Sequence, residues 1–221
     1  MGEATNVKIA DAGPAGWIAY AIATWMAWAF LCGFVTPKAL LFMACVSLAC
    51  TIPYLGAAIT QLKLGGVAIL PQGGGPAGAG GLLPNRQLAL WPYTDVRSPH
   101  LVWGNDHILV HTTLRGGALK VGFPNPRGWL AYHLGESLFV KRARFEAGRE
   151  YFDLGSSSEC YCNDRFLELE TLGPAGIVEP ECTVCHREVW QVFDRVSFTA
   201  EERAVQALIE AYGLDEESPF L

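Results

Sequence analysis

The chain has 221 residues, of which 51% are hydrophobic and 17% are charged, and its formal net charge is −6. An acidic chain without a basic stripe interleaved with aromatic residues lacks the electrostatic footprint of a nucleic-acid-binding protein, which excludes that class of partner. These averages hide two compositions. Residues 17–62 contain one charged residue, Lys38, whereas charged and turn residues are frequent over residues 83–221. The two parts therefore need separate interpretations.

The first part has the length and composition of two membrane spans. Trp17–Val35 is an uncharged run of 19 residues, and Ala39–Leu62 is an uncharged run of 24. At about 1.5 Å rise per helical residue, each run is long enough to cross a hydrocarbon core of about 30 Å. We therefore expect residues 1–66 to hold an N-terminal tail and a two-helix transmembrane hairpin, with spans at about 17–35 and 39–62.

The lysines around these runs predict the orientation of the hairpin. Lys8 and Lys63 flank its outer ends, and Lys38 lies in the turn between the spans. Because cytoplasmic segments carry the excess of positive charge, this distribution places the following domain in the cytoplasm. The predicted localisation is therefore the membrane, with the lipid bilayer as a partner.

The same region resembles a known family. The strings are Gly13–Gly16, Ala23-Thr24, Val35–Leu40 and Gly56–Ala58. Together, about residues 10–66 resemble the first two membrane spans of the acetate uptake transporter family. That family has six spans, so the resemblance implies a membrane hairpin without implying transport.

A glycine-rich stretch follows the hairpin. Gly73, Gly75 and Gly78 match the pattern G-x-G-x-x-G of dinucleotide-binding turns. That mechanism needs an unbroken strand before the glycines and a long helix after them, and Pro71 and Pro84 interrupt both. We therefore interpret residues 67–82 as a glycine-rich linker, and no cofactor is expected.

The part after the linker, residues 83–221, has the pattern of an antiparallel β domain. Short runs of β-branched and aromatic residues alternate with turns every eight to twelve residues, as in a sandwich or barrel. The predicted strands are Gln87–Trp91, His107–Thr113, Ala118–Gly122, Trp129–His133, Ser137–Lys141, Phe166–Thr171 and His186–Phe193. A C-terminal helix follows, with Thr199 as its cap, Glu202 three residues later, and Gly213 at its end. Its apolar stripe is Val205, Leu208, Ile209 and Tyr212.

Several strings in this domain resemble a second family. They are Asn85–Tyr93, Trp103–Asp106, Phe123–Trp129 and Ser158–Asp164, and Phe166–Gly173 and His186–Phe193 continue them in order. About residues 83–200 resemble the C-terminal half of an uncharacterised branch of the galactose-mutarotase-like (aldose 1-epimerase) superfamily. The family fold is a β supersandwich of roughly twice this length. The resemblance therefore implies a partial supersandwich, and the overall expected fold class is α+β.

Mutarotation requires one group that protonates the ring oxygen and another that takes the proton of the anomeric hydroxyl. The resemblance implies that Glu170, in a Leu-Glu-Thr context, is the base. The family's acidic histidine corresponds to Trp91, so the acid is unassigned, with His107 and His133 as strand candidates. The predicted substrate-binding residues are Trp91, Tyr93, Arg127 and Trp129. The alternative is that Glu170 is a strand carboxylate like Glu168 and that the tryptophans belong to the core.

Four cysteines of the β domain allow one further interpretation. A zinc site would use Cys160, Cys162, Cys182 and Cys185. Four thiolates suit tetrahedral zinc, but the C-x-C spacing of the first pair does not fit the usual C-x₂₋₄-C arrangement, and no metal is favoured.

Three functions remain open from the sequence. The first is a membrane-tethered module that binds a carbohydrate or polyol. The second is an aldose 1-epimerase-type isomerase that uses Glu170. The third is a structural or non-functional fusion of a transporter fragment with half of a supersandwich, whose open sheet edges would favour self-association.

Overall fold

Short runs in which core-facing and outward-facing residues alternate, separated by turns, fold into two antiparallel sheets. The computed structural model describes residues 57–73, 84–177, 182–219 and 221. Within these residues there are eleven strands and two helices. The strands are β1 (Ala57–Leu62), β2 (Val67–Pro71), β3 (Ala89–Leu90), β4 (Leu101–Trp103), β5 (His107–His111), β6 (Ala118–Phe123), β7 (Trp129–Leu134), β8 (Ser137–Ala143), β9 (Ser158–Asn163), β10 (Leu167–Leu172) and β11 (Glu188–Phe193). The helices are α4 (Phe152–Gly155) and α5 (Glu202–Tyr212).

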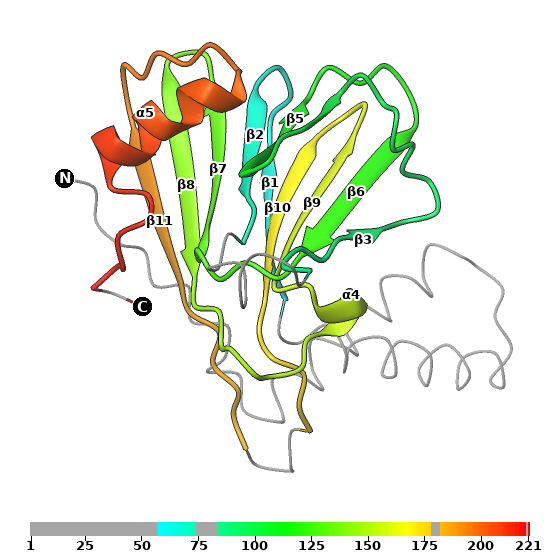
Figure 1. Cartoon of the computed structure of the whole chain (residues 1–221), viewed down its shortest axis with the longest axis vertical. Helices are drawn as coiled ribbons and strands as arrows, with labels where there is room; N and C mark the ends of the chain where they lie inside the picture. The colour runs from blue at the N-terminus through cyan, green and yellow to red at the C-terminus, as the bar shows by residue number, and fades with distance from the viewer. Residues whose placement is uncertain (1–56, 74–83, 178–181, 220) are drawn as a thin grey trace, which may run out of the picture. The chain divides into compact units, whose positions relative to one another are not determined.

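The strands form a five-stranded sheet with the order β1-β10-β9-β6-β3 and a six-stranded sheet with the order β11-β8-β7-β2-β5-β4. Figure 1 shows the two sheets facing each other. All strand pairs in both sheets are antiparallel. In the five-stranded sheet, Glu159 of β9 lies opposite Glu170 of β10 on one side and opposite Gly122 of β6 on the other. These strands and α5 belong to one compact unit of the chain.

The main core lies between the sheets. Along β9, Cys160 and Cys162 point into it, and by the two-residue period of a strand Glu159 and Tyr161 point to the outer face of the five-stranded sheet. The buried apolar residues of this core are Ala68, Leu70, Leu101, Ile108, Val110, Leu114, Leu119, Val121, Phe123, Leu130, Tyr132, Cys160, Cys162, Leu167 and Leu169.

Helix α5 covers the other face of the six-stranded sheet (Figure 1). Val205, Leu208 and Ile209 are buried against the sheet, and Tyr212 packs at the edge of this second core. The helix ends at Gly213, whose left-handed backbone (φ 58°) favours glycine. The predicted helix and its apolar stripe are thus present, but its N-cap is Glu201 and not Thr199.

A buried ammonium group joins the two sheets. Lys141 of β8 is fully buried, and its Nζ lies 2.8 Å from Glu188 Oε1 on β11 of the same sheet. It also donates to three acceptors of the five-stranded sheet: the carbonyls of Ala58 (2.7 Å) and Leu169 (3.0 Å) and the hydroxyl of Thr60 (3.0 Å). Burial lowers the pKa of Lys141, and the charge of Glu188 opposes that shift. The ammonium is therefore surrounded by acceptors from both sheets.

The predicted two-helix membrane hairpin, and the membrane localisation based on it, are wrong. Residues 57–62, which we assigned to the second span, form β1, and this strand pairs with β10 along its whole length. No helix among the described residues combines the length and the apolarity needed to cross a bilayer. The predicted span 17–35 and the rest of 39–62 lie outside the described residues. An uncharged run also suits a strand that joins a sheet, and pairing with β10 satisfies the backbone groups along one side of β1, which lies at the edge of its sheet.

The predicted linker at residues 67–82 is also wrong over its first part. Val67–Pro71 form β2, all five residues are buried, and the strand lies between β7 and β5. The two sheets therefore include strands from both sides of the glycine-rich stretch. The partial sandwich expected to begin at residue 83 instead draws β1 and β2 from the region that we gave to the hairpin and the linker.

We predict that replacing Lys141 with methionine destabilises the chain by about 3–5 kcal/mol, because Glu188 would keep a buried charge without its cation. Urea unfolding of the full chain measures this change. The double variant Lys141→Met/Glu188→Gln should recover part of the loss. Arg149→Met, which removes an exposed pair with Glu146, is the matched control and should change stability by less than about 1 kcal/mol. Equal losses in Lys141→Met and the control would contradict the proposed role of Lys141 in joining the sheets.

Candidate functional site

The outer face of the five-stranded sheet carries a buried group of three charged residues. Glu159 and Glu170 are paired across β9 and β10, and Lys120 lies two residues before Gly122 on β6. Lys120 Nζ lies 2.6 Å from Glu159 Oε2 and 3.0 Å from each carboxylate oxygen of Glu170. Glu159 is 1% exposed and Glu170 4%. The predicted base is therefore buried beside a second carboxyl group and an ammonium group.

Both carboxyl groups have raised pKa values, and that of Glu159 favours its protonated form near neutral pH. Burial raises the pKa of Glu159 to about 8, and it also raises the pKa of Glu170. The charge and the hydrogen bond of Lys120, and to a smaller extent a hydrogen bond with Glu159, oppose this rise, but the pKa of Glu170 stays above its ordinary value. Glu159 Oε1 and Glu170 Oε1 are both buried without a hydrogen-bond partner in the described part of the chain, and Glu170 Oε1 has Lys120 Nζ as its ion-pair partner at 3.0 Å. The pair thus offers Glu159 as a candidate acid beside the predicted base.

Lys120 balances the charge of this pair. Burial by itself would lower the pKa of the ammonium, but the charges and hydrogen bonds of both glutamates outweigh burial and raise the pKa above its usual value. With Lys120 charged, Glu159 protonated and Glu170 ionised, the three residues have no net charge. This balance permits their burial.

Two aromatic residues lie beside the charged group. The ring of Trp91 lies over Lys120, with its centroid 4.7 Å from Nζ. Gly122 permits this approach, because a Cβ at that position would lie 3.3 Å from the Trp91 ring and 2.5 Å from Ser156 Oγ. Tyr93 is 48% exposed and meets Tyr161 edge to face. One face of the indole is therefore occupied by the ammonium, and Tyr93 is the aromatic surface that solvent reaches.

The turn that carries these aromatics is fastened to β6. The Thr94 hydroxyl accepts a hydrogen bond from the Lys120 backbone N–H (2.8 Å) and donates one to the Lys120 carbonyl (2.9 Å). Thr94 N also donates to the Trp91 carbonyl, which closes the turn. Trp91 and Tyr93 are thus held next to Lys120 by the local backbone.

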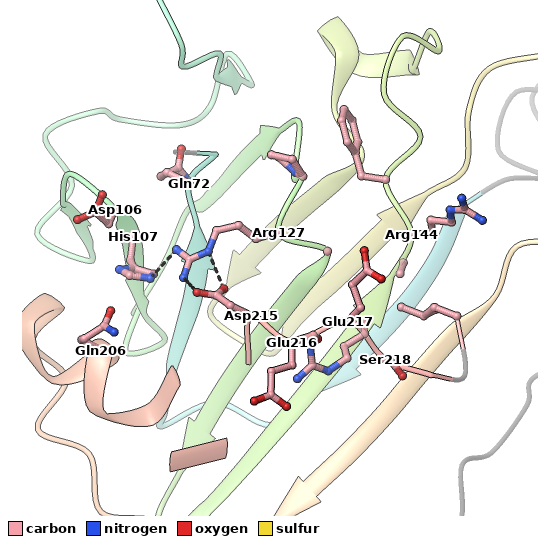
Figure 2. A pocket seen from close by; sticks show the side chains of 16 residues that line it. Gln72, Asp106, His107, Arg127, Arg144, Gln206, Asp215, Glu216, Glu217 and Ser218 are labelled. Carbon is pink, nitrogen blue, oxygen red and sulfur yellow. Dashed lines mark hydrogen bonds and ion pairs between the residues drawn. The ribbon is translucent and has the colours of Figure 1, made fainter. Parts of the chain in front are cut away.

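The other two predicted substrate-binding residues lie elsewhere, on the face of the six-stranded sheet that α5 covers. Trp129 is fully buried in the core beneath α5 and donates from Nε1 to Asp215 Oδ1 at 2.8 Å, so it has no face for a ligand. Arg127 makes a two-pronged pair with Asp215 and donates to His107 Nε2 (Figure 2). The sequence-predicted residues therefore divide into two places, and only Glu170, Trp91 and Tyr93 come together.

The four cysteines of the zinc site considered from the sequence also lie in two different environments. Cys160 and Cys162 are buried in the core between the sheets, whereas Cys182 and Cys185 are exposed, and all four are free thiols. Burial raises the pKa of Cys162 to about 12. Among the described residues there is no group of three or more His, Cys, Asp or Glu residues that could hold a metal ion.

Sequence reasoning missed Glu159 and Lys120. Glu159 lies in the string Ser158–Asn163, whose alternation of cysteines with polar residues indicates a strand with one polar face. That alternation does not reveal that Glu159 faces Glu170, because the register of β9 against β10 is set by the whole sheet. The candidate acid therefore came from the structure alone.

Comparison of the chain with protein-family models, with curated proteins and with solved structures finds no match. The interpretation of the site accordingly depends on its geometry.

The raised pKa of Glu159 predicts a pH-dependent stability. Its ordinary pKa is 4.5 and its folded-state pKa is about 8, so the folded state binds a proton more tightly than the unfolded state. The resulting stability is present below about pH 4.5 and is lost as the pH rises to about 8. Glu159→Gln cannot ionise, and its stability relative to the wild type should rise over this interval by a few kcal/mol in order of magnitude. Urea unfolding at several pH values measures the difference. Parallel curves for the variant and the wild type would refute the assigned pKa, and Glu168→Gln is the control that should remain parallel.

Proposed function

We propose that the chain binds an aldose at the outer face of the five-stranded sheet and interconverts its α and β anomers, as an aldose 1-epimerase does. The observation that carries this proposal is the pair of buried carboxyl groups of Glu159 and Glu170, which both lie within 3.0 Å of Lys120 Nζ and whose pKa values burial raises. The resemblance of residues 83–200 to the mutarotase-like superfamily supports the same reaction through Glu170.

The reaction moves two protons without any oxidant or cofactor. The Glu170 carboxylate takes the proton of the anomeric hydroxyl while the protonated Glu159 gives its proton to the ring oxygen. The bond between C1 and the ring oxygen breaks, and C1 becomes the carbonyl carbon of the open-chain sugar. Rotation about the C1–C2 bond and the reverse proton transfers close the ring with the other anomeric configuration. The two glutamates end with the protons they began with.

The surroundings tune these two groups for proton transfer. A buried carboxyl with a pKa of about 8 remains protonated at neutral pH, which is the state that a general acid needs. Lys120 stabilises the ionised form of Glu170, which is the state that a general base needs. Two chemically identical side chains thus take different roles because only one of them is protonated.

The aromatic residues supply the binding surface for the sugar ring. Tyr93 is the exposed ring next to Lys120, and stacking of a sugar's apolar face on such a ring is a common mode of carbohydrate binding. In this proposal Trp91 does not replace the family's histidine as an acid. It positions Lys120 through the contact of its ring with the ammonium, which keeps the ammonium between the two carboxyl groups.

The experiment is to dissolve pure α-glucose or α-galactose with the full chain and to follow the approach to anomeric equilibrium by polarimetry or proton NMR. We expect acceleration over the spontaneous rate. Glu170→Gln and Glu159→Gln should each lower kcat/KM by about 10²-fold or more, because each removes one proton-transfer group. Tyr93→Ala should mainly raise KM.

Glu168→Gln is the matched control, since Glu168 lies on the same strand and the same face two residues earlier, where its carboxylate accepts a hydrogen bond from Gln61. Its rate should stay within about twofold of the wild type. Absence of acceleration by the folded wild-type chain, or loss of activity in Glu168→Gln equal to that in Glu170→Gln, would overturn the proposal. Sugar-dependent thermal stabilisation without turnover would reduce the function to carbohydrate binding.

A further inference from the structure

A pair of exposed thiols lies in the segment that leads into β11. Cys182 and Cys185 are separated by two residues and precede His186, in the pattern C-x-x-C-H. Both are free thiols, and both are exposed. Val184, which lies between them, is 54% exposed. The pair is therefore open to reagents in solution.

The backbone around the pair can form the turn that a disulfide requires. A disulfide holds its two Cα atoms about 4.4–6.8 Å apart, and the first and fourth residues of a β-turn lie less than about 7 Å apart. Residues 182–185 belong to no helix or strand. Their backbone groups make no hydrogen bond to another described residue. Bending them into such a turn therefore breaks no hydrogen bond within the described part of the chain.

The chain is fixed immediately after the pair. His186 Nε2 lies 2.8 Å from the hydroxyl oxygen of Thr171 on β10. Glu188, the first residue of β11, pairs with the buried Lys141 at 2.8 Å. Because these two contacts hold the start of β11, closing the cysteine pair alters the segment before the strand and leaves the strand in place. The reduced and the oxidised pair are therefore both compatible with this fold.

The cysteines of β9 have a different environment. Cys160 and Cys162 are buried in the core between the sheets, and burial raises the pKa of both thiols. Because the thiolate is the nucleophile in disulfide exchange, a buried thiol with a raised pKa is protected from it. The described part of the chain thus contains one exposed pair of thiols and one protected pair.

A zinc site is the other chemistry for which a C-x-x-C spacing is known, and it needs four ligands. Among the described residues there is no group of three or more His, Cys, Asp or Glu residues that could hold a metal ion. His186 Nε2 is also in contact with the Thr171 hydroxyl. The described surroundings of the pair therefore favour thiol chemistry.

We propose that Cys182 and Cys185 form a reversible disulfide by exchange with a small disulfide such as oxidised glutathione. The thiolate of one cysteine attacks a glutathione sulfur and releases one glutathione thiolate. The thiolate of the other cysteine then attacks the protein sulfur of the mixed disulfide and releases the second. The pair loses two electrons and two protons, and oxidised glutathione gains them and becomes two molecules of reduced glutathione.

The test is thiol mapping of the full chain after equilibration with several ratios of reduced to oxidised glutathione. The chain is then denatured in an alkylating reagent and digested with trypsin, which puts the exposed pair in peptide 166–187 and the buried pair in peptide 150–165. As the share of oxidised glutathione rises, peptide 166–187 should lose two hydrogen atoms and escape alkylation. Excess reduced glutathione should restore both thiols. Peptide 150–165 should be alkylated twice at every ratio.

Single variants test the second step of the exchange. Cys182→Ser and Cys185→Ser should each keep glutathione on the remaining thiol, because no neighbouring thiolate releases it. The inference is overturned if peptide 166–187 stays reduced in excess oxidised glutathione, if the wild type keeps glutathione on both cysteines, or if the buried pair is oxidised to the same extent. These outcomes do not affect the aldose 1-epimerase proposal, because neither cysteine belongs to the group formed by Lys120 and the two glutamates.

Discussion

A buried ammonium group needs hydrogen-bond acceptors around it. Strand β10 supplies acceptors to two such groups, Lys141 and Lys120. On the inner face, the Leu169 carbonyl is one of the acceptors of Lys141, which comes from the opposite sheet. On the outer face, Glu170, the next residue along the strand, is an acceptor of Lys120. The two-residue period places the Leu169 side chain in the core and the Glu170 side chain on the outer face, and the acceptor of Lys141 is the backbone carbonyl of Leu169. The contact that joins the sheets and the contact that forms the candidate site therefore depend on the same strand and the same register.

The sequence pattern predicted most of the strands that follow the glycine-rich stretch. It did not predict the two strands that precede this stretch, β1 and β2. Trp129–Leu134 and Ser137–Ala143 begin where the turn residues indicated, because a glycine-containing turn and alternation act locally. β1 was missed because an uncharged run fits both a membrane span and a strand, and β2 was missed because it ends at Pro71 before the glycine-rich stretch and was interpreted as linker. The distinction comes from pairing with β10, β5 and β7, whose partner residues lie between 36 (Pro71 with His107) and 115 (Ala57 with Leu172) positions further along the chain and leave no local signal.

The candidate site shows the same limit. The resemblance to the mutarotase-like superfamily predicted Glu170 as a site residue. Trp91 and Tyr93 were predicted because they lie where that superfamily has its histidine motif. Their partner Glu159 became visible only when the register was known. Conversely, Trp129 looked like a binding residue because it is aromatic and lies next to an arginine turn, but it is fully buried. Residue type alone does not separate a tryptophan of the core from one that faces a ligand, since both are selected for a large apolar surface.

The attachment of Thr94 to Lys120 has a consequence for access to the charged group. Two hydrogen bonds between the Thr94 hydroxyl and the Lys120 backbone make the turn a continuation of the sheet edge, so the turn cannot swing away unless both are broken. The Tyr93 side chain, in contrast, is half exposed and turns about its own bonds. Motion at this edge of the charged group is therefore rotation of the Tyr93 side chain, on the nanosecond timescale of exposed side chains, and not slower movement of the turn.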